Sequence, residues 1–425
     1  MKKSKLYRLG TETCIDIFRG TEKRSFADCS IIDQVLILDI IQKKKNNQFD
    51  KIKNEKKKIF NHNRSTLNQL ITLKTKKTNY YEFLIQKLIR TFKFFLGFLS
   101  NFFTNFLHNS NFFFSNSNSS RVEFSRVNFS LNNKKKTNHV ELLKNLRIVD
   151  YKRGVKVSGN RAYYLIGPGV SLNLALIQYG LDFMLKRNFI SIQTPFYMNE
   201  KILKCCVQLQ DFIEQLYSMG KNDKKFLIAT SEQTICAFHF KEKIHAEYLP
   251  LKYVGISTCF RKESGSHGKD TNGIFRVHQF EKIEQFIICN SDKYESWKFF
   301  EILISNSKEF YKSLQIPFIC INIPTIDLNK TASRKTDLLG WFPSGSNYKE
   351  LVSCSNCLEY QSENLYIETY KNGILPQKSY LHMLNSTLCA TTRTICCIAE
   401  NYSENNGLTI PNALRDYLGF SFIYF

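Results

Sequence analysis

Apolar and polar positions follow different patterns in the first third of the chain and in the rest. Over 31–41 the apolar residues recur at roughly helical spacing, and a Lys-rich polar stretch follows at 43–58. No proline precedes Pro168, so none interrupts a long helix in this region. The pattern predicts two antiparallel helices over about 27–62 and 66–107, which form a coiled-coil-like arm.

The run 92–114 is unusually rich in Phe, and 115–136 is rich in Ser and Asn before it becomes basic. Asn and Ser interrupt the apolar run, and its length is marginal for crossing a bilayer. We therefore interpret it as a helix that packs on its partner helix or on another subunit, with a membrane anchor as the alternative. The segment 115–136 is typical of a loop or linker.

From about 139 onward the pattern is that of a mixed globular domain. Residues 171–189 predict an amphipathic helix, and 190–196 predict a strand that Pro195 closes. The stretch 260–286 predicts a strand, a polar Gly-rich loop and a second strand. Residues two apart on a strand share a face. This rule groups Arg261 with Glu263 at the end of the first strand and, on the second, Arg276, His278, Phe280, Lys282 and Glu284.

The side chains that this hairpin gathers suit a triphosphate, a flat base and an amino acid. Arginine binds phosphate oxygens in a fork and stacks on planar groups. Phe280 offers a ring face, and Glu284 can accept from a hydroxyl or an ammonium group. The alternative interpretation is a surface hairpin with ordinary salt bridges.

Most of the net charge of +23 lies at the start of the chain. Residues 1–140 hold 27 Lys and Arg against 10 Asp and Glu, whereas 141–425 hold 33 against 27. A basic segment of this kind attracts polyanions by counterion release, which indicates nucleic acid. A solvated, highly charged helix pair without a partner is the alternative.

The 13 cysteines are scattered without the spacing of a disulfide framework, which favours free thiols in a reducing compartment. No apolar segment follows the first five residues, so we expect no secretory signal. Cys354 and Cys357 form a single CxxC pair with no second Cys or His pair nearby. We interpret that pair as structural and expect no zinc.

Several segments together resemble a known family. The hairpin resembles motif 2 of class II aminoacyl-tRNA synthetases, 171–196 resembles motif 1, and 381–402 resembles motif 3. Within that class, the Thr-Ser-Glu loop at 230–232 and the run ELVSCSNC at 350–357 are similar to the seryl-tRNA synthetases of eukaryotic cytosolic type. On its own, the 230–232 loop could equally be a helix cap. The resemblance is strong over about 139–420, weaker over 11–60 and very weak over 64–130.

The resemblance implies an α+β fold, in which the antiparallel β-sheet of class II synthetases is flanked by helices. It also implies an N-terminal antiparallel helical arm. We expect a tRNA-binding domain over 1–138, with the arm at about 27–125, and a catalytic domain over 139–425. In the family motif 1 builds a dimer interface, so a homodimer is expected. The expected compartment is the cytoplasm, with an organelle as the alternative.

The implied activity is that of a serine–tRNA ligase. Serine would attack the α-phosphate of ATP, and the seryl group would pass to the 3′ end of tRNA(Ser), and of tRNA(Sec). Positioning and charge stabilisation would supply most of the rate. The basic arm would lie across the long variable arm of the tRNA and recognise shape and backbone.

The resemblance also assigns roles to individual residues. Arg261, Glu263 and Arg393 are the expected catalytic residues. The expected serine contacts are Thr230, Glu232, Arg261, Glu284, Asn385 and Thr387. The expected ATP contacts are Arg261, Glu263, Arg276, Val277, His278, Gln279, Phe280, Glu350, Leu351, Val352, Ser353 and Arg393. Glu350 and Ser353 would also hold Mg²⁺, which prefers carboxylate and phosphate oxygens.

The sequence departs from the family pattern at a few positions. Glu363 and Asn364 stand where the family usually has two arginines, and Thr392 replaces a glutamate before Arg393. The first change puts any contact of those arginines in doubt. Two other interpretations stay open: an enzyme that loads an amino acid onto a carrier protein, and a catalytically silent nucleic-acid-binding paralogue.

Overall fold

The structure is a computed structural model of the whole chain. It describes residues 122–123, 137–207, 213–220, 224–263, 272–292, 294–324, 327–329, 331–370 and 379–425. The chain divides into two compact units, Met1–Leu107 and His108–Phe425, and all described residues belong to the second. The predicted arm helices over 27–62 and 66–107 and the Phe-rich run 92–114 lie outside the described residues.

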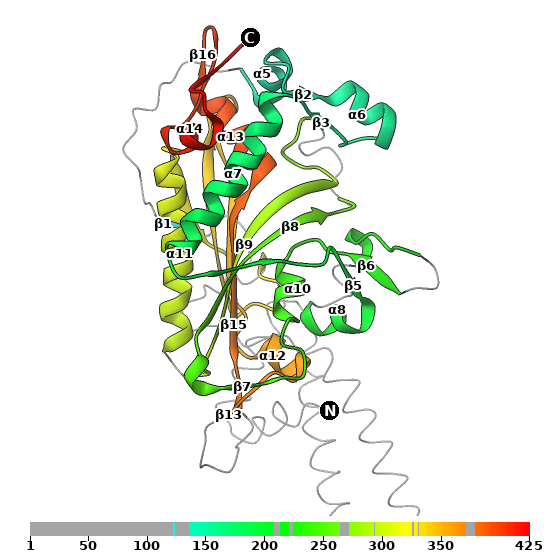
Figure 1. Cartoon of the computed structure of the whole chain (residues 1–425), viewed down its shortest axis with the longest axis vertical. Coiled ribbons are helices and arrows are strands. Elements are labelled where there is room, and N and C mark those ends of the chain that lie inside the picture. Colours follow the sequence, from blue (N-terminus) through cyan, green and yellow to red (C-terminus); the bar gives the residue numbers. More distant parts are fainter. Residues whose placement is uncertain are drawn as a thin grey trace, which may run out of the picture. The chain divides into compact units, whose positions relative to one another are not determined.

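A sheet of eight described strands forms the centre of the second unit (Figure 1). All neighbouring strands pair antiparallel except the last two, β8 and β4, which are parallel. In sheet order the strands are β1 (Val122–Glu123), β10 (Phe318–Asn322), β11 (Arg334–Phe342), β12 (Asn347–Asn356), β15 (His382–Ala390), β9 (Gln279–Cys289), β8 (Leu251–Phe260) and β4 (Ile190–Gln193).

Three helices cover one face of this sheet, which we call the back face (Figure 1). They are α7 (Pro168–Leu185), α11 (Glu295–Ser313) and α13 (Thr391–Tyr402). Gly180 allows α7 to approach β9, because a Cβ there would lie 2.4 Å from Ile283 Cδ1. On the same face, Gln285 of β9 donates to Leu303 O and to Ser307 Oγ of α11.

The opposite face, which we call the open face, is covered at one end by short helices. There Phe286, Ile288 and Met383 of the sheet join a second apolar cluster. The helices that complete this cluster are α8 (Glu200–Cys206), α10 (Glu232–Cys236) and α12 (Tyr360–Leu365). Farther along β9, polar residues of the open face take the place of the apolar ones.

Short elements complete the described part. The remaining helices are α5 (His139–Asn145), α6 (Tyr151–Ser158), α14 (Asn412–Leu418) and the single turns η2 (Ile213–Gln215) and η3 (Ala246–Tyr248). The remaining strands form small sheets: β2 (Val149–Asp150) with β3 (Tyr164–Leu165); β5 (Tyr197–Asn199) with β6 (Lys225–Leu227); β7 (Lys243–His245) with β13 (Glu368–Tyr370) and β14 (Ser379–Tyr380); and β16 (Ser403–Glu404) with β17 (Gly407–Thr409) and β18 (Phe422–Tyr424).

A buried polar cluster joins α5 to α13. Glu400 is 1% exposed and accepts from the backbone N–H of His139 at 3.1 Å and of Ser344 at 3.0 Å. Its Oε1 also lies 2.7 Å from His139 Nδ1. Burial alone would raise the pKa of the Glu400 carboxyl, but these hydrogen bonds outweigh it and hold the pKa below its usual value.

The expected antiparallel sheet flanked by helices is confirmed. The helix predicted over 171–189 begins earlier, because Pro168 is suited to a first helical position, and it ends at Leu185. The strand predicted over 190–196 ends at Gln193, two residues before Pro195. The predicted hairpin is formed by β8 and β9, which pair from Leu251–Ile288 to Phe260–Gln279.

One detail of the hairpin prediction is wrong. Strand β8 ends at Phe260, so Arg261 and Glu263 lie beyond it, and Glu263 has a φ of +53°. The alternation of a regular strand therefore does not place this pair on a common face. Arg276 and His278 similarly precede β9, which begins at Gln279.

Candidate active site

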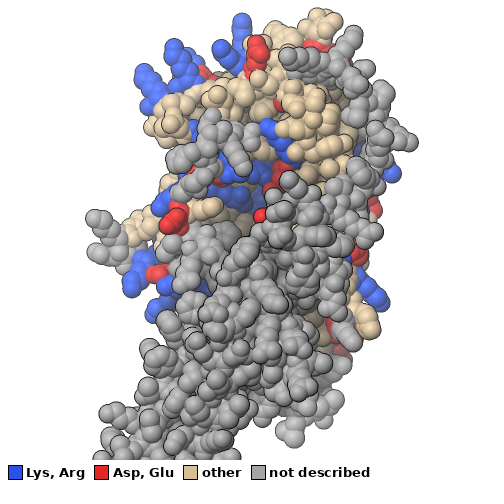
Figure 2. All heavy atoms as spheres, turned by 180° about the vertical axis from the view of Figure 1, so that it is seen from behind, with Lys and Arg blue, Asp and Glu red and all other residues tan. Residues whose placement is uncertain are grey.

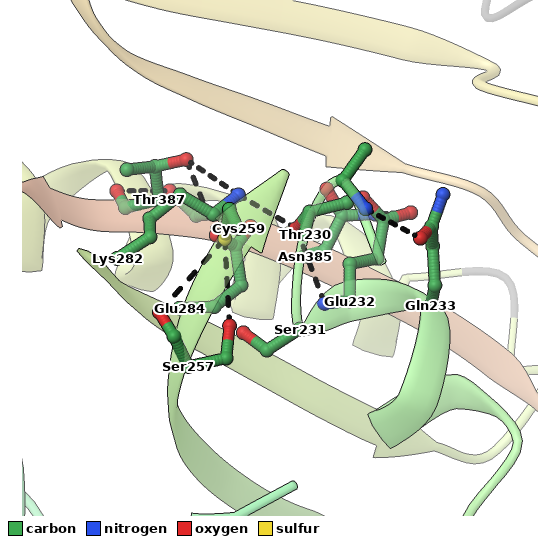
Figure 3. Close-up of polar contacts among 12 residues, drawn as sticks. Thr230, Ser231, Glu232, Gln233, Ser257, Cys259, Lys282, Glu284, Asn385 and Thr387 are labelled. Atoms are coloured by element: carbon green, nitrogen blue, oxygen red, sulfur yellow. Dashed lines mark hydrogen bonds and ion pairs between the residues drawn. The ribbon is translucent and has the colours of Figure 1, made fainter. Parts of the chain in front are cut away.

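Four polar side chains meet on the open face where β9, β15 and the loop before α10 come together (Figure 3). Lys282 forms a close ion pair with Glu284, and both side chains are at most 6% exposed. Lys282 Nζ also donates to Thr230 Oγ1 at 2.7 Å, and Thr387 Oγ1 donates to Glu284 Oε2 at 3.3 Å. Glu284 and Thr387 face each other because they are direct partners in the pairing of β9 with β15.

A second carboxylate, Glu232, begins α10 beside this group (Figure 3). Its Oε1 accepts from Asn385 Nδ2 at 2.9 Å and from Gln361 Nε2 at 3.1 Å. Burial raises the pKa of Glu232 to about 7, and the charge of Glu284 adds to the rise, while Lys282 opposes it. Glu232 therefore changes charge near neutral pH and is suited to bind an ammonium group when ionised.

Residues 230–232 do lead into a helix, as the helix-cap interpretation predicted, but Thr230 and not Ser231 supplies the side-chain bond. Ser231 occupies the cap position of α10 but makes no capping hydrogen bond through its side chain. Instead, Thr230 Oγ1 accepts from the backbone N–H of Glu232 at 3.2 Å. The loop thus turns the Thr230 hydroxyl toward Lys282 and the Glu232 carboxylate toward Asn385.

Arg261 lies between this loop and the start of β9. Its Nε donates to Ala229 O at 3.3 Å, and its guanidinium carbon lies 5.2 Å from the centre of the Phe280 ring. The backbone N–H of Arg261 donates to His278 O at 2.9 Å, and its carbonyl lies 2.9 Å from His278 Nδ1. These contacts fix an arginine over an aromatic ring, an arrangement suited to a phosphate beside a base.

Arg276 and Glu263, at the two ends of the hairpin loop, pair with each other. Arg276 Nη1 donates to Glu263 Oε2 at 2.6 Å. The Glu263 side chain is 8% exposed, whereas that of Arg276 is 32% exposed. A guanidinium has five N–H donors, so Arg276 can hold Glu263 with one edge and still offer others to an anion.

Glu350 and Ser353 lie on one face although they are three residues apart. The pairing of β11 with β12 shifts between Leu338 and Leu339, and Leu351 has no direct partner. This β-bulge inserts one residue, so Glu350 and Ser353 both turn to the open face. Arg393, near the start of α13, donates to Glu350 Oε1 at 3.2 Å and to Glu350 O at 3.1 Å.

The charges around Glu350 favour its ionised form. Its partial burial raises the pKa, but the cations Arg393, Lys335 and Arg261 outweigh that effect, so the pKa lies below its usual value. An ionised carboxylate beside a hydroxyl is a donor set that fits Mg²⁺. Within the described ranges, no group of three or more His, Cys, Asp or Glu residues is arranged to hold a metal ion.

Asp337 adds a further carboxyl to this part of the open face. It is the direct strand partner of Ser353 and lies 3.4 Å from Lys335 Nζ. Burial raises the pKa of Asp337 to about 6, and the charge of Glu350 adds to the rise. Lysines, arginines and acidic side chains line a hollow on the face drawn in Figure 2, which fits a site for charged molecules.

Some of the expected nucleotide contacts point elsewhere. Val277, Leu351 and Val352 are buried in the core at 2%, 1% and 2% exposure, so only their backbone atoms could contact a ligand. Gln279 faces away from Phe280 and lines a cavity of about 480 Å³ bordered by α6, β3 and α7. Asn385, one of the expected serine contacts, donates to Glu232 Oε1 at 2.9 Å.

The expected ATP and serine contacts did not include three other residues beside the two carboxylates. Lys282 and Gln361 bond the two pocket carboxylates directly. Gly255, the direct partner of Glu284 in β8, gives room to the Thr-Ser-Glu loop, because a Cβ there would lie 3.1 Å from Ser231 Oγ. Of these three residues, only Lys282 could have been inferred from the sequence. It lies two positions before Glu284 on the same strand, so the two side chains share a face.

Every cysteine in the described part of the chain is a free thiol, as the scattered spacing predicted. Cys354 and Cys357 are both buried, and Cys357 Sγ lies 3.7 Å from Asn385 Nδ2. Among the described residues, no helix combines the length and the apolar character needed to cross a membrane.

The antiparallel sheet flanked by helices is that of a class II tRNA synthetase core. Residues 216–402 match the family described as tRNA synthetase class II core domain (G, H, P, S and T). A crystal structure of a cytoplasmic serine–tRNA ligase from Naegleria fowleri, in complex with AMP, superimposes with a TM-score of 0.90. It is 38% identical, and the alignment covers 98% of each chain. The chain belongs to the serine–tRNA ligase family.

Two further relatives agree with this assignment. The cytoplasmic serine–tRNA ligase of Dictyostelium discoideum is 54% identical over 289 residues, which are 68% of this chain and 64% of that protein. The chain thus spans less than two thirds of the length of this curated relative. A seryl-tRNA synthetase from Pyrococcus horikoshii complexed with ATP is 29% identical, with a TM-score of 0.89 over 96% of this chain and 97% of that one.

Proposed function

We propose that this protein is a serine–tRNA ligase, which activates L-serine with ATP and transfers it to the 3′ end of tRNA(Ser) and tRNA(Sec). One observation carries the proposal: two carboxylates with different partners lie close together on the open face. Glu232, held by two amide groups, suits an ammonium group, and Glu284, held by Lys282 and Thr387, suits a hydroxyl. Serine carries both of these groups on adjacent carbons.

The nucleotide would bind beside this pocket along the open face. Phe280 would stack on the adenine, and Glu263 would accept from its amino group. Arg261 would hold the α-phosphate and the serine carboxylate, since it lies 3.3 Å from Ala229 O in the loop that carries Glu232. Arg276 and Arg393 would hold the outer phosphates. The two related structures are complexes with AMP and with ATP, which supports the binding of an adenine nucleotide.

The chemistry requires little beyond positioning. The serine carboxylate attacks the α-phosphate in line, and pyrophosphate leaves. Arg261 and Arg393 stabilise the charge that develops on the phosphate oxygens. Glu350 and Ser353 would hold Mg²⁺, which neutralises phosphate charge when bound. The 3′-terminal hydroxyl of the tRNA then takes the seryl group from the adenylate.

The tRNA partner is assigned to the basic start of the chain. Residues 1–140 carry most of the excess of Lys and Arg, which suits the phosphate backbone. Deletion of residues 27–107, which ends before β1 of the central sheet, is expected to abolish tRNA charging and spare adenylate formation. Charging that persists at the wild-type rate would contradict this role.

A homodimer is proposed on the resemblance of α7 and β4 to motif 1. The surface of α6, β3 and α7 supports it, because large apolar side chains there are exposed: Val157 at 66%, Leu174 at 58% and Tyr164 at 45%. Sedimentation of the wild type and of Leu174→Glu tests the proposal, with a shift of the variant to monomer as the expected result.

The name of the Dictyostelium relative supports a cytoplasmic location.

Serine-dependent ATP–pyrophosphate exchange on the purified protein tests the proposed activity, with alanine and threonine as control substrates. We expect exchange with serine alone. Glu284→Ala is expected to lose serine activation by roughly two orders of magnitude and to keep the ATP affinity, because the serine hydroxyl loses its acceptor and the buried Lys282 ammonium loses its carboxylate partner. Unchanged exchange in that variant would remove Glu284 from the site, and exchange with none of the three amino acids would contradict the activity.

A further inference from the structure

Lys282 contacts three of the expected serine-binding residues but belongs to none of the contacts assigned to ATP or serine. Its side chain is 6% exposed and lies on β9 between Phe280 and Glu284, on the open face. Burying an ammonium group is costly unless partners compensate for the loss of water. A lysine at this position therefore needs a defined set of acceptors, and the pocket supplies them.

Three acceptors surround the Lys282 ammonium. They are Glu284 Oε2 in a close ion pair, Thr230 Oγ1 at 2.7 Å and Thr387 Oγ1 at 3.5 Å. An ammonium group has three N–H donors and no acceptor. Its three donors are thus directed at the protein, on three segments that are distant in the sequence. This arrangement makes Lys282 a support of the pocket and leaves the substrate to other groups.

The charge on Lys282 also fixes the direction of the neighbouring hydrogen bonds. Because Lys282 only donates, both threonine hydroxyls accept from it, and Thr387 turns its own proton to Glu284 Oε2 at 3.3 Å. Thr230 Oγ1 accepts a second bond, from the backbone N–H of Glu232. The Thr230 proton is then free to be donated to a further acceptor, and Glu284 Oε1 is left to accept.

We propose that Lys282 is a specificity-determining positioning residue, which holds the Glu284 carboxylate as an acceptor for the substrate hydroxyl. The inference rests on the proposed activation of serine. A ligand whose hydroxyl lies beside Glu284 donates a hydrogen bond to this carboxylate in place of water. Alanine offers a methyl group instead and leaves the held carboxylate unpaired, which costs binding energy.

Lys282, together with Lys335, is also a cation that opposes the rise in the pKa of Glu232. It lowers the pKa of Glu232, which burial and Glu284 raise to about 7. The titratable, charged and amide groups that face Glu232 come from five elements: Lys282 and Glu284 of β9, Gln361 of α12, Asn385 of β15, Lys335 of β11 and Cys236 of α10, together with Cys357 after β12. Removal of Lys282 is therefore expected to raise the pKa of Glu232 further.

The test measures serine and ATP kinetics of the full-length Lys282→Met and Lys282→Arg variants by pyrophosphate exchange. Lys252→Met is the matched control, because Lys252 lies on β8 and its ammonium lies 5.9 Å from the Phe299 ring, away from the pocket. Lys282→Met is expected to raise the KM for serine by at least about tenfold and to narrow the preference for serine over alanine. The KM for ATP stays within about twofold in the same variant.

Two more readouts separate positioning from simple structural support. In Lys282→Met the pH at which kcat/KM for serine is half-maximal moves upward, and Lys282→Arg restores part of the serine preference. The double variant Lys282→Met/Glu284→Gln leaves no unpaired buried charge, so it is expected to fold and bind ATP while serine preference stays lost.

Two results would overturn the proposal while leaving the function intact. One is serine kinetics in Lys282→Met equal to the wild type. The other is an equal loss for ATP and serine in both the single and the double variant, which indicates a purely structural role. If the wild-type enzyme itself shows no serine-dependent exchange, the proposed function and this inference fall together.

Discussion

Glu232 titrates within the pH range of an ordinary assay, so serine binding is expected to strengthen as the pH rises. Burial raises the pKa of this carboxyl to about 7 in the substrate-free structure. A protonated Glu232 cannot attract the serine ammonium, so a proton and the substrate compete for the same group. The ammonium of serine loses its own proton only at higher pH, which leaves Glu232 as the titrating partner.

The size of the effect follows from the fraction of Glu232 that is ionised. With a pKa of about 7, about one tenth is ionised near pH 6 and about nine tenths near pH 8. Apparent affinity scales with the competent fraction, so kcat/KM for serine is expected to rise about tenfold over this interval. This parameter reports the free enzyme, whose pKa the structure describes.

Pyrophosphate exchange measured with limiting serine and saturating ATP gives the profile directly. Glu232→Gln is the matched control, since an amide of the same shape cannot titrate, and its profile is expected to be flat with a higher KM. An inflection near pH 7 that survives in Glu232→Gln would assign the titration to another group. A flat wild-type profile would refute the link between Glu232 and the ammonium.

Two further predictions concern stability and packing. Glu400→Ala is expected to lower the free energy of unfolding by about 3 kcal/mol in urea titrations, because it leaves buried donors of His139 and Ser344 unpaired. The folded-state pKa of Glu400 is lowered, so its contribution to stability is present above the unfolded pKa and is lost as the pH falls. An equal loss of unfolding free energy in Glu400→Ala at acidic and at neutral pH would contradict this prediction. Gly255→Ala places a Cβ 2.3 Å from Ile235 Cδ1 and is expected to reduce kcat/KM for serine about tenfold with little change for ATP. Gly220→Ala, whose Cβ meets nothing within 4 Å, is the control, and equal activity of the two variants would refute the packing argument.

The sequence predicted those parts of the site that depend on local periodicity. Asn385 and Thr387 are two apart on β15, and both reach the pocket, as alternation requires. The hairpin strands and the position of Arg393 near the start of α13 follow from the same kind of local pattern. In these cases each residue's direction is set by its own strand or helix, so neighbours in sequence suffice to infer it.

Other parts of the site depend on pairing between distant segments, so the local pattern of the sequence could not predict their geometry. A spacing of three puts Glu350 and Ser353 on opposite faces of a regular strand, and only the bulge at Leu351 brings them together. The left-handed backbone of Glu263 likewise breaks the period that we assumed. Gln361 reaches Glu232 across 129 positions of sequence, and no local pattern reports such a contact.

The alternation along β9 links correct folding to correct assembly of the site. A slip of one residue against β8 and β15 would turn Ile283 and Gln285 into the pocket and press Lys282 and Glu284 onto the helices of the back face. Such a molecule would bury an ion pair among apolar side chains and lie well above the native state in free energy. Compact molecules with the slipped register would be inactive, but their high free energy keeps their population small. For this protein, the fraction of chains that fold is expected to approximate the fraction that can bind the proposed substrate.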